Sequence, residues 1–306
     1  MKVSVVVPVF RSEDCLAELA QRVDSVLSES HPSYELIFVD DRSPDGSWVT
    51  ICELVDRSPS VTGIRLRKNV GQDNAIMAGL HHVDGDAVVI MDDDLQHDPK
   101  DIPALLAELQ KGRDVVYARF SHKKQAFWKN FGSWFNGRIG TIVLGKPKHI
   151  YMSPFKAMTR EVADEVIRYG GPFAYIDGLI FTVTDDIAQI DAEHQARFAG
   201  ESNYNLVRSI GVWLKLATSF SVLPLRIATL TGMALSLVSF AMAAYFAFEA
   251  LFLSRTPEGW PSLIVSVFFL GGVQLMGIGA LGEYIGRMFI TQNGRPQFTV
   301  RDIRRR

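Results

Sequence analysis

The chain has 306 residues, of which 47% are hydrophobic and 22% charged, and its formal net charge is −2. This length exceeds one average domain without demanding three, and the near-zero charge provides no global field of the kind that favours nucleic acid. The two cysteines, Cys15 and Cys52, form neither a disulfide framework nor the spacing of a metal site.

Residues 1 to about 120 alternate between strand and helix patterns. Nearly continuous apolar strands that alternate with amphipathic stretches favour a mostly parallel sheet covered by helices on both faces. No G-x-G-x-x-G follows the first strand, which argues against a dinucleotide-binding fold of the dehydrogenase type. The predicted strands are 3–9, 34–39, 61–66, 87–91 and 114–118, and the predicted helices are 15–27, 48–55, 74–82 and 102–109.

Two of these predicted strands end in carboxylates. Asp40 and Asp41 follow the second strand, and 92–94 is a run of three aspartates after the fourth. Unpaired charge is too costly to bury in a core, so we expect these groups at the carboxyl edge of the sheet, where open α/β folds bind ligands. Carboxylates suit Mg²⁺, which shares its ligands with substrate phosphates. A solvated acidic turn that caps the next helix is the alternative for the run 92–94.

The pattern weakens between about 145 and 200, where we predict a helix at 161–169 and, from polarity alone, a surface loop at 194–204. Apolar residues then recur at helical spacing from Leu206 to Phe220, with basic residues between them. This amphipathic pattern predicts a helix lying in the lipid headgroup plane. A helix that faces the core of the domain is the alternative.

Two long apolar runs follow. Residues 227–253 contain a single charged group, Glu249, and residues 263–286 contain only Glu283. Each run exceeds the ~20 residues needed to cross a bilayer, whereas a buried helical hairpin would need a larger surrounding core. Six arginines lie in 287–306 but only Arg255 lies in the loop between the runs, so the positive-inside tendency predicts that both termini face the cytoplasm.

Several short motifs occur in order from residue 3 to residue 298. They are 6–10 (VVPVF), 39–47 (VDDRSPDGS), 67–72 (RKNVGQ), 91–96 (MDDDLQ), 199–204 (AGESNY), 224–226 (PLR), 269–274 (FLGGVQ) and 282–287 (GEYIGR). This set resembles the inverting GT-A glycosyltransferases of family 2, and specifically the polyprenyl-phosphate glycosyltransferases. That group includes dolichyl-phosphate mannose synthase, bactoprenol glucosyltransferases and undecaprenyl-phosphate aminoarabinose transferases.

The resemblance implies an α/β fold in four parts. A Rossmann-like GT-A catalytic domain with a mostly parallel sheet would occupy 1–203, an interfacial amphipathic helix 204–225, a two-helix transmembrane hairpin 226–286 and a basic cytoplasmic tail 287–306. The chain would be an integral protein of the inner (cytoplasmic) membrane, with its catalytic domain and both termini in the cytoplasm.

The resemblance also implies the reaction and its partners. A sugar would pass from a nucleotide sugar, with UDP-glucose as the first choice, to undecaprenyl or another polyprenyl phosphate, with Mg²⁺ or Mn²⁺ as cofactor. Membrane lipids and a second copy of the chain are expected partners, and nucleic acid is not. The implied nucleotide-sugar site comprises Pro8, Phe10, Glu13, Asp41, Asp92, Asp93, Arg119, Arg197 and Ser202; the metal ligands are Asp92, Asp94 and Gln96; the catalytic residues are Asp92, Asp94, Lys129, Lys156 and Arg197.

The sequence departs from the family pattern at three places, one of which is Asp93 in the middle D-x-D position, where alanine is frequent. Arg42 replaces the usual glycine after the paired aspartates, and Ser153 stands where relatives often carry an acid. If that acid helps catalysis in relatives, this chain must use Asp177 or Asp185 or manage without it. A catalytically inactive, membrane-tethered sugar-nucleotide-binding scaffold therefore stays open. A processive polysaccharide synthase is the other alternative, although 195–198 (QARF) does not match the Q-x-x-R-W motif of those enzymes.

Overall fold

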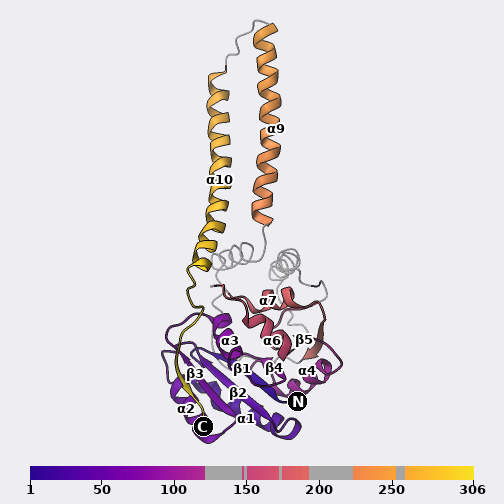
Figure 1. Ribbon diagram of the computed structural model, residues 1–306, viewed down its shortest axis with the longest axis vertical. Helices are drawn as coiled ribbons and strands as arrows, with labels where there is room; N and C mark the ends of the chain where they lie inside the picture. The colour runs from indigo at the N-terminus through magenta and orange to yellow at the C-terminus, as the bar shows by residue number, and fades with distance from the viewer. Residues whose placement is uncertain (121–146, 148–149, 172–173, 193–222, 253–258) are drawn as a thin grey trace. The chain divides into compact units, whose positions relative to one another are not determined.

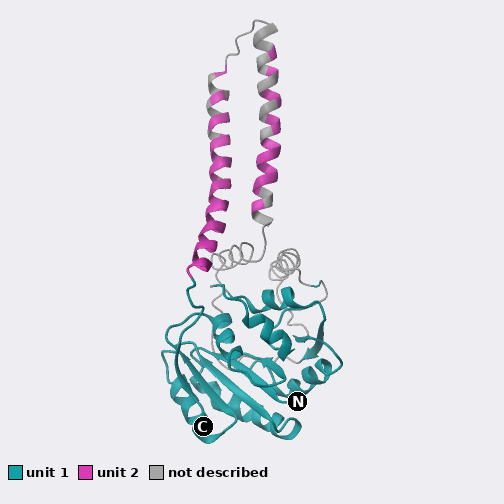
Figure 2. Cartoon of the chain, in the orientation of Figure 1, with its two compact units in different colours: residues 1–203, 294–306 teal, residues 204–293 magenta. Residues whose placement is uncertain are grey.

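The computed structural model describes residues 1–120, 147, 150–171, 174–192, 223–252 and 259–306. The chain divides into two compact units (Figure 2): unit 1 comprises residues 1–203 and 294–306, and unit 2 comprises residues 204–293. Unit 1 therefore contains both ends of the chain, and unit 2 is an insertion between them.

Unit 1 is built on an eight-stranded sheet with the order β7-β5-β6-β4-β1-β2-β3-β8. The central strand β1 pairs in parallel with β2 and β4, and β2 pairs in parallel with β3. β5 and β7 form another parallel pair, while β6 and β8 run antiparallel to their neighbours. The bounds are β1 Val3–Val9, β2 Tyr34–Asp40, β3 Val61–Leu66, β4 Ala87–Ile90, β5 Val115–Phe120, β6 Lys156–Thr159, β7 Ile187–Ala192 and β8 Val300–Arg304.

Helices cover this sheet because its central strands are apolar on both faces (Figure 1). In β1, Val5 and Val7 join the main core cluster, whereas Val6 meets the helix on the other face at Gly79. A Cβ on Gly79 would lie 2.4 Å from a Val6 methyl carbon, so only glycine permits this close approach. The helices are α1 Glu13–Ser30, α2 Ser47–Arg57, α3 Gln72–Leu80, α4 Ile102–Leu109, α6 Arg160–Ile167 and α7 Ile176–Val183, with a short 3-10 helix η1 at Pro99–Asp101.

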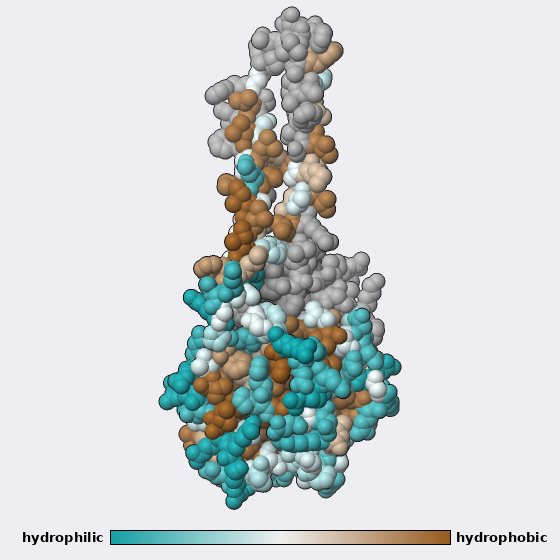
Figure 3. Space-filling view, viewed as in Figure 1, coloured by the Kyte–Doolittle hydropathy of each residue, from teal (hydrophilic) through white to brown (hydrophobic). Residues whose placement is uncertain are grey.

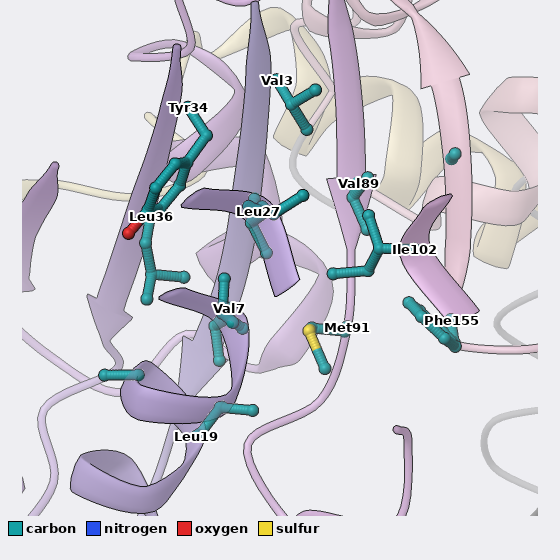
Figure 4. Close-up of a cluster of buried hydrophobic side chains, with 14 of the residues drawn as sticks. Val3, Val7, Leu19, Leu27, Tyr34, Leu36, Val89, Met91, Ile102 and Phe155 are labelled. Carbon is teal, nitrogen blue, oxygen red and sulfur yellow. The ribbon is translucent and has the colours of Figure 1, made fainter. Parts of the chain in front are cut away.

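The main core cluster lies between the central strands and the helices α1, α2 and α4. Figure 4 shows side chains from successive strands gathered there, including Val7 of β1, Leu36 of β2 and Val89 of β4. Leu19 of α1 and Ile102 of α4 are fully buried in the same cluster. Burial of each such side chain stabilises the fold by about 1.5–3 kcal/mol, and the resulting rigid sheet holds the loops that follow its strands.

The predicted alternation over residues 1–120 is confirmed, with helix and strand ends that differ by a few residues. Among the described residues, the elements that were not predicted are η1, β6, α7, β7 and β8. β6 and β8 are short, and β8 follows a long apolar insertion. Both therefore lie outside the alternation of strand and helix patterns by which the strands of residues 1–120 were identified. The predicted helix 161–169 corresponds to α6.

The C-terminal segment is part of unit 1 rather than only a basic tail. β8 extends the sheet beside β3, and the Arg67 N–H donates to the Thr299 carbonyl oxygen at 2.8 Å. The Gln297 side-chain amide donates to the Gly171 carbonyl oxygen at 2.8 Å, and the ring of Phe298 meets that of His81 edge-on. These contacts hold the residues that precede and follow α3.

Unit 2 contains two long helices, α9 (Leu223–Phe252) and α10 (Trp260–Gln292), which pack against each other. Many apolar side chains on both helices are exposed (Figure 3), among them Leu237 and Phe248 on α9 and Leu275 and Met288 on α10. Over the ranges that the structure describes, no helix combines the length and apolarity required to cross a membrane. The two predicted spans are thus not confirmed, and most of the predicted amphipathic helix 204–225 lies outside the described residues.

Candidate active site

The carboxyl ends of the parallel strands bring the predicted groups to one edge of the sheet. Val9 of β1 lies opposite Asp40 of β2, and Val6 lies opposite Ile90 of β4. Phe10, Asp41 and the aspartates 92–94 therefore follow neighbouring strands at the same edge. Lys156 begins the antiparallel β6 opposite Ile90, so it lies at this edge too. The register of these strands therefore brings charged groups from separate strands to one edge of the sheet, as predicted.

The three aspartates after β4 have different partners. Asp92 Oδ1 accepts from Gln72 Nε2 at 2.6 Å. Asp93 accepts from the Phe10 N–H at 3.1 Å and also from the Ser12 hydroxyl. Asp94 Oδ1 accepts from the Gln96 N–H at 3.1 Å. Asp93 thus ties the turn to the loop after β1, and Asp92 ties it to the start of α3.

Burial, followed by the negative charges of Asp94 and Asp93, raises the pKa of Asp92 to about 7, against the opposing effects of Lys156 and Gln72. Burial is also the main reason that the pKa of Asp93 is raised. Clustered carboxylates that are costly to ionise together are stabilised by a cation. Asp92 and Asp94 therefore fit a divalent ion by charge and by their hard oxygen atoms. Within the described part of the chain, no three His, Cys, Asp or Glu side chains are grouped to hold a metal by themselves.

Asp40 and Asp41, at the end of β2, are both buried and bonded within the protein. Asp40 forms an ion pair with Arg65 at 3.3 Å and accepts from the Ser43 N–H at 2.8 Å. Asp41 accepts from the N–H groups of Val70 and Gly71, each at 2.8 Å. Burial raises the pKa of Asp41, and these two hydrogen bonds oppose that rise. Asp41 thus fixes the loop before α3, and its predicted role facing a base stays a prediction.

The predicted nucleotide pocket contains an exposed aromatic ring. Phe10 is 45% exposed, and the Arg11 guanidinium lies 5.3 Å from the centre of its ring. Glu13 Oε2 accepts from the Gly46 N–H at 2.9 Å, which links the start of α1 to the loop before α2. Pro8 is buried within β1, opposite Val39 of β2. An exposed ring beside a guanidinium at a sheet edge is a suitable surface for stacking a nucleotide base.

Arg42, which stands in place of the family's usual glycine, keeps a left-handed backbone conformation with φ 59°. A left-handed conformation costs an ordinary residue about 1–2 kcal/mol, and glycine avoids this cost. We therefore expect Arg42→Gly to be more stable than Arg42→Ala by about 1 kcal/mol. Chemical denaturation of the two variants measures the difference; equal stabilities would show that the loop relaxes around alanine.

Lys156 lies in a buried ion pair. Only 3% of the residue is exposed, its Nζ contacts Asp177 Oδ1, and the Tyr117 hydroxyl donates to the same oxygen at 2.9 Å. Asp177 comes from the first turn of α7, which was not predicted. The sequence therefore did not predict this ion pair, and the phosphate-binding role expected of Lys156 would require it to rearrange. Asp177, one of the two candidate substitute acids, is engaged by Lys156 and Tyr117.

Asp73, at the start of α3, is a further carboxylate beside this pair that sequence reasoning missed. Its Oδ1 accepts from the Ile176 N–H at 3.2 Å. Burial, together with the charge of Asp177, raises its pKa from 3.8 to about 6, against the opposing effects of the Ile176 hydrogen bond and Lys156.

This raised pKa predicts a pH-dependent stability. The folded chain holds the Asp73 proton more tightly than the unfolded chain, so the free energy of unfolding should fall as pH rises from about 4 to about 6. Asp73→Asn should remove this loss. We expect the variant to be more stable than the parent by about 1–3 kcal/mol at pH 7.5, with little difference at pH 4. Denaturation curves at both pH values test this, with exposed Asp14→Asn as the control. A constant difference across pH would contradict it.

The remaining predicted residues are placed as follows. Arg119, near the end of β5, pairs with Asp191 of β7 at 2.8 Å and is half exposed. Gln96 follows the aspartate turn, where its backbone N–H bonds to Asp94. Lys129, Arg197 and Ser202 lie outside the described residues. The residues that contact the aspartate turn without a role assigned from the sequence include Ser12, Gln72 and His97. The motif 67–72 contains Gln72, so its position in the motif was the only available signal.

Comparison with known proteins identifies relatives along the whole chain. The model of glycosyl transferase family 2 matches residues 4–167. A bactoprenol glucosyl transferase of Shigella phage SfV is 34% identical over 307 residues, covering 99% of each chain. An undecaprenyl-phosphate 4-deoxy-4-formamido-L-arabinose transferase of Klebsiella pneumoniae is 31% identical over 305 residues, covering 99% of this chain and 93% of the relative.

Among solved structures, glucosyl-3-phosphoglycerate synthase from Mycobacterium tuberculosis in complex with phosphoglyceric acid has a similar fold. The TM-score is 0.53 at 18% identity, with 72% of this chain and 78% of that chain covered. The same enzyme in complex with Mn²⁺, UDP-glucose and phosphoglyceric acid matches with a TM-score of 0.51 at 16% identity and the same coverage. These likenesses support the GT-A-like α/β fold. Together with the family match and the full-length relatives, they show that this chain belongs to glycosyl transferase family 2 and is a glycosyltransferase.

Proposed function

We propose that this chain transfers a sugar from a nucleotide sugar, UDP-glucose being our first choice, to undecaprenyl or another polyprenyl phosphate. The observation that carries this proposal is the turn with Asp92 and Asp94 at the carboxyl edge of the sheet, close to the exposed ring of Phe10. Support for the acceptor comes from the full-length relatives, whose names specify bactoprenol and undecaprenyl phosphate.

The proposed chemistry makes modest demands on the protein. An acceptor phosphate is already ionised at neutral pH, so an activated general base of the usual kind is unnecessary. The negative charge that builds on the departing nucleoside diphosphate must instead be stabilised. Mg²⁺ or Mn²⁺ held by Asp92 and Asp94 would supply Lewis-acid stabilisation there. The solved enzyme of similar fold was crystallised with Mn²⁺ and UDP-glucose.

The protein's own residues would orient the donor. Asp93 holds the loop after β1 through Phe10 and Ser12, so the ring of Phe10 and the acidic turn form one connected unit. Gln72 holds Asp92 from the start of α3. Attack by the acceptor phosphate from the side opposite the leaving group would invert the configuration at the anomeric carbon. Lys129 and Arg197 stay predicted contacts to the acceptor and donor phosphates.

We further propose that unit 2 anchors the chain in the cytoplasmic membrane as a helical hairpin, with the catalytic unit and both termini in the cytoplasm. The exposed apolar side chains along α9 and α10 support this, because an extensive apolar surface is unfavourable in water. A polyprenyl chain cannot leave the bilayer readily, since each buried methylene contributes about 0.8 kcal/mol. Alkaline extraction of membranes should leave the protein in the pellet, and a C-terminal tag should resist protease added from the periplasmic side.

The reaction itself is tested with purified protein in detergent, undecaprenyl phosphate, Mn²⁺ or Mg²⁺, and a panel of radiolabelled UDP- and GDP-sugars. We expect one donor to produce a glycolipid, and EDTA to abolish its formation. Donor binding without any product would instead support the inactive scaffold. Formation of a long polysaccharide would support a processive synthase, and product formation in EDTA would contradict the role of the metal.

A further inference from the structure

His97 is a buried titratable residue that the proposed chemistry does not use. It lies at the end of the aspartate turn and is 4% exposed. Its ring is nearly parallel to the ring of Phe120, with centres 5.2 Å apart and an interplanar angle of 8°. It is also nearly parallel to Phe155, at 5.3 Å and 14°. The two phenylalanines belong to adjoining chain segments, because the Ala118 N–H of β5 donates to the Phe155 carbonyl oxygen at 3.0 Å.

One polar contact of this ring is with the backbone of Asp92. The Asp92 N–H lies 3.3 Å from His97 Nδ1. A backbone N–H can only donate, so Nδ1 must be the acceptor and carry no proton in this arrangement. The stacked phenylalanines fix the plane of the ring, and the plane of the ring fixes the direction in which Nδ1 accepts. His97 therefore connects the edge formed by β5 and β6 to the first residue of the aspartate turn.

The turn that His97 closes needs such support. Leu95 has φ 59°, a left-handed conformation that is unfavourable for a residue with a side chain. Asp92 and Asp94 are also acidic neighbours in one short turn, and they repel each other when both are ionised. Inside the turn, the Gln96 N–H donates to Asp94 Oδ1. A strained, self-repelling turn keeps its shape only when surrounding groups determine it.

We propose that His97 is a positioning residue that holds Asp92 and Asp94 in the geometry that binds the divalent cation and the donor diphosphate. This inference rests on the proposed function for the identity of what the carboxylates bind. It assigns His97 no contact with substrate, because its action passes through the Asp92 backbone. Groups that orient metal ligands typically change metal affinity or activity about 10–100-fold when they are replaced.

Three variants of His97 separate the hydrogen bond from the packing. His97→Asn retains an acceptor near the position of Nδ1. His97→Leu has nearly the same shape as His97→Asn but lacks that acceptor. His97→Phe retains an aromatic ring for stacking but lacks the acceptor. The first readout is Mn²⁺ binding in the presence of UDP, followed by electron paramagnetic resonance, which requires no turnover. The second is the division of the kinetic effect between kcat and the KM for polyprenyl phosphate.

We expect His97→Leu and His97→Phe to weaken Mn²⁺ binding about 10–100-fold and to lower kcat similarly, with the KM for polyprenyl phosphate within about twofold of the parent. His97→Asn should restore Mn²⁺ affinity to within about threefold. His31→Asn, at the end of α1, is the control and should change neither quantity.

Equal Mn²⁺ affinities for the Asn and Leu variants would overturn the proposal, as would a loss of thermal stability with unchanged affinity. If His97→Phe fails to fold, the Mn²⁺ affinities of His97→Asn and His97→Leu still decide whether the acceptor at this position matters. If the parent chain forms no glycolipid with any donor, the proposed function fails, while the difference in Mn²⁺ binding still tests the role of His97.

Discussion

Asp94→Asn is expected to lower kcat for sugar transfer by at least about 100-fold, because a preorganised charge that stabilises the leaving group typically contributes that much or more. Asparagine keeps the shape of the side chain and can still accept from the Gln96 N–H, the bond that Asp94 Oδ1 makes here. It removes the negative charge that a divalent cation requires. Initial rates of glycolipid formation at saturating donor measure the effect.

The control for this substitution is Asp98→Asn. Asp98 lies four positions further along the chain and caps the short helix η1 by accepting from the Lys100 N–H, a role that asparagine fills equally well. We expect its kcat to stay within about twofold of the parent. A rate for Asp94→Asn close to that of Asp98→Asn would remove Asp94 from the metal site, and with it the central feature of the proposed function.

Lys156→Met is expected to destabilise unit 1 by about 3–5 kcal/mol, because it leaves the buried carboxylate of Asp177 without its positive partner. Methionine has a similar length, so the loss is mainly electrostatic. The Tyr117 hydroxyl still donates to Asp177 and compensates only partly. The double variant Lys156→Met with Asp177→Leu should regain much of the loss, because replacing both partners removes the uncompensated charge. Unfolding by denaturant in detergent, followed by tryptophan fluorescence, tests this.

The matched control is the exposed pair of Arg113 and Asp186, with Nη1 and Oδ1 2.6 Å apart and side chains 49% and 42% exposed. It lies at the beginning of β5 and β7, away from the sheet edge that holds Lys156. Arg113→Met should destabilise the unit far less than Lys156→Met, because solvent screens an exposed ion pair. If Lys156→Met destabilises unit 1 no more than Arg113→Met does, the ion pair with Asp177 does not account for the burial of Lys156. Its predicted binding of phosphate is then the better explanation of its presence.

The buried pair also bears on the acid that the sequence lacks at Ser153. Sequence reasoning proposed Asp177 or Asp185 as its substitute. In the structure, Asp177 is held by Lys156 and Tyr117, and it contributes to the raised pKa of Asp73. Both buried donors thus occupy the carboxylate of Asp177. The pair therefore provides a fixed charge arrangement beside the aspartate turn.

Much of unit 1 could be predicted because its signals are local. Continuous apolar runs such as those of β1 and β4 identify buried strands, and charged residues directly after them must leave the core. The sequence thus determined the alternation over residues 1–120 and the position of Asp92 and Asp94 at the carboxyl edge of the sheet. The ordered motifs also identified the family, which the full-length relatives confirm.

The tertiary structure decided which groups meet across long stretches of chain. The pairing of Lys156 with Asp177, the contact of His97 with the Asp92 backbone, and the return of β8 to β3 join residues that no local pattern connects. Such contacts depend on the register of strands and on the packing of rings, and packing complementarity is a property of the folded chain. For the same reason, Arg42 could be recognised as a departure from the family pattern, but only the backbone shows that it adopts a left-handed conformation, which glycine favours.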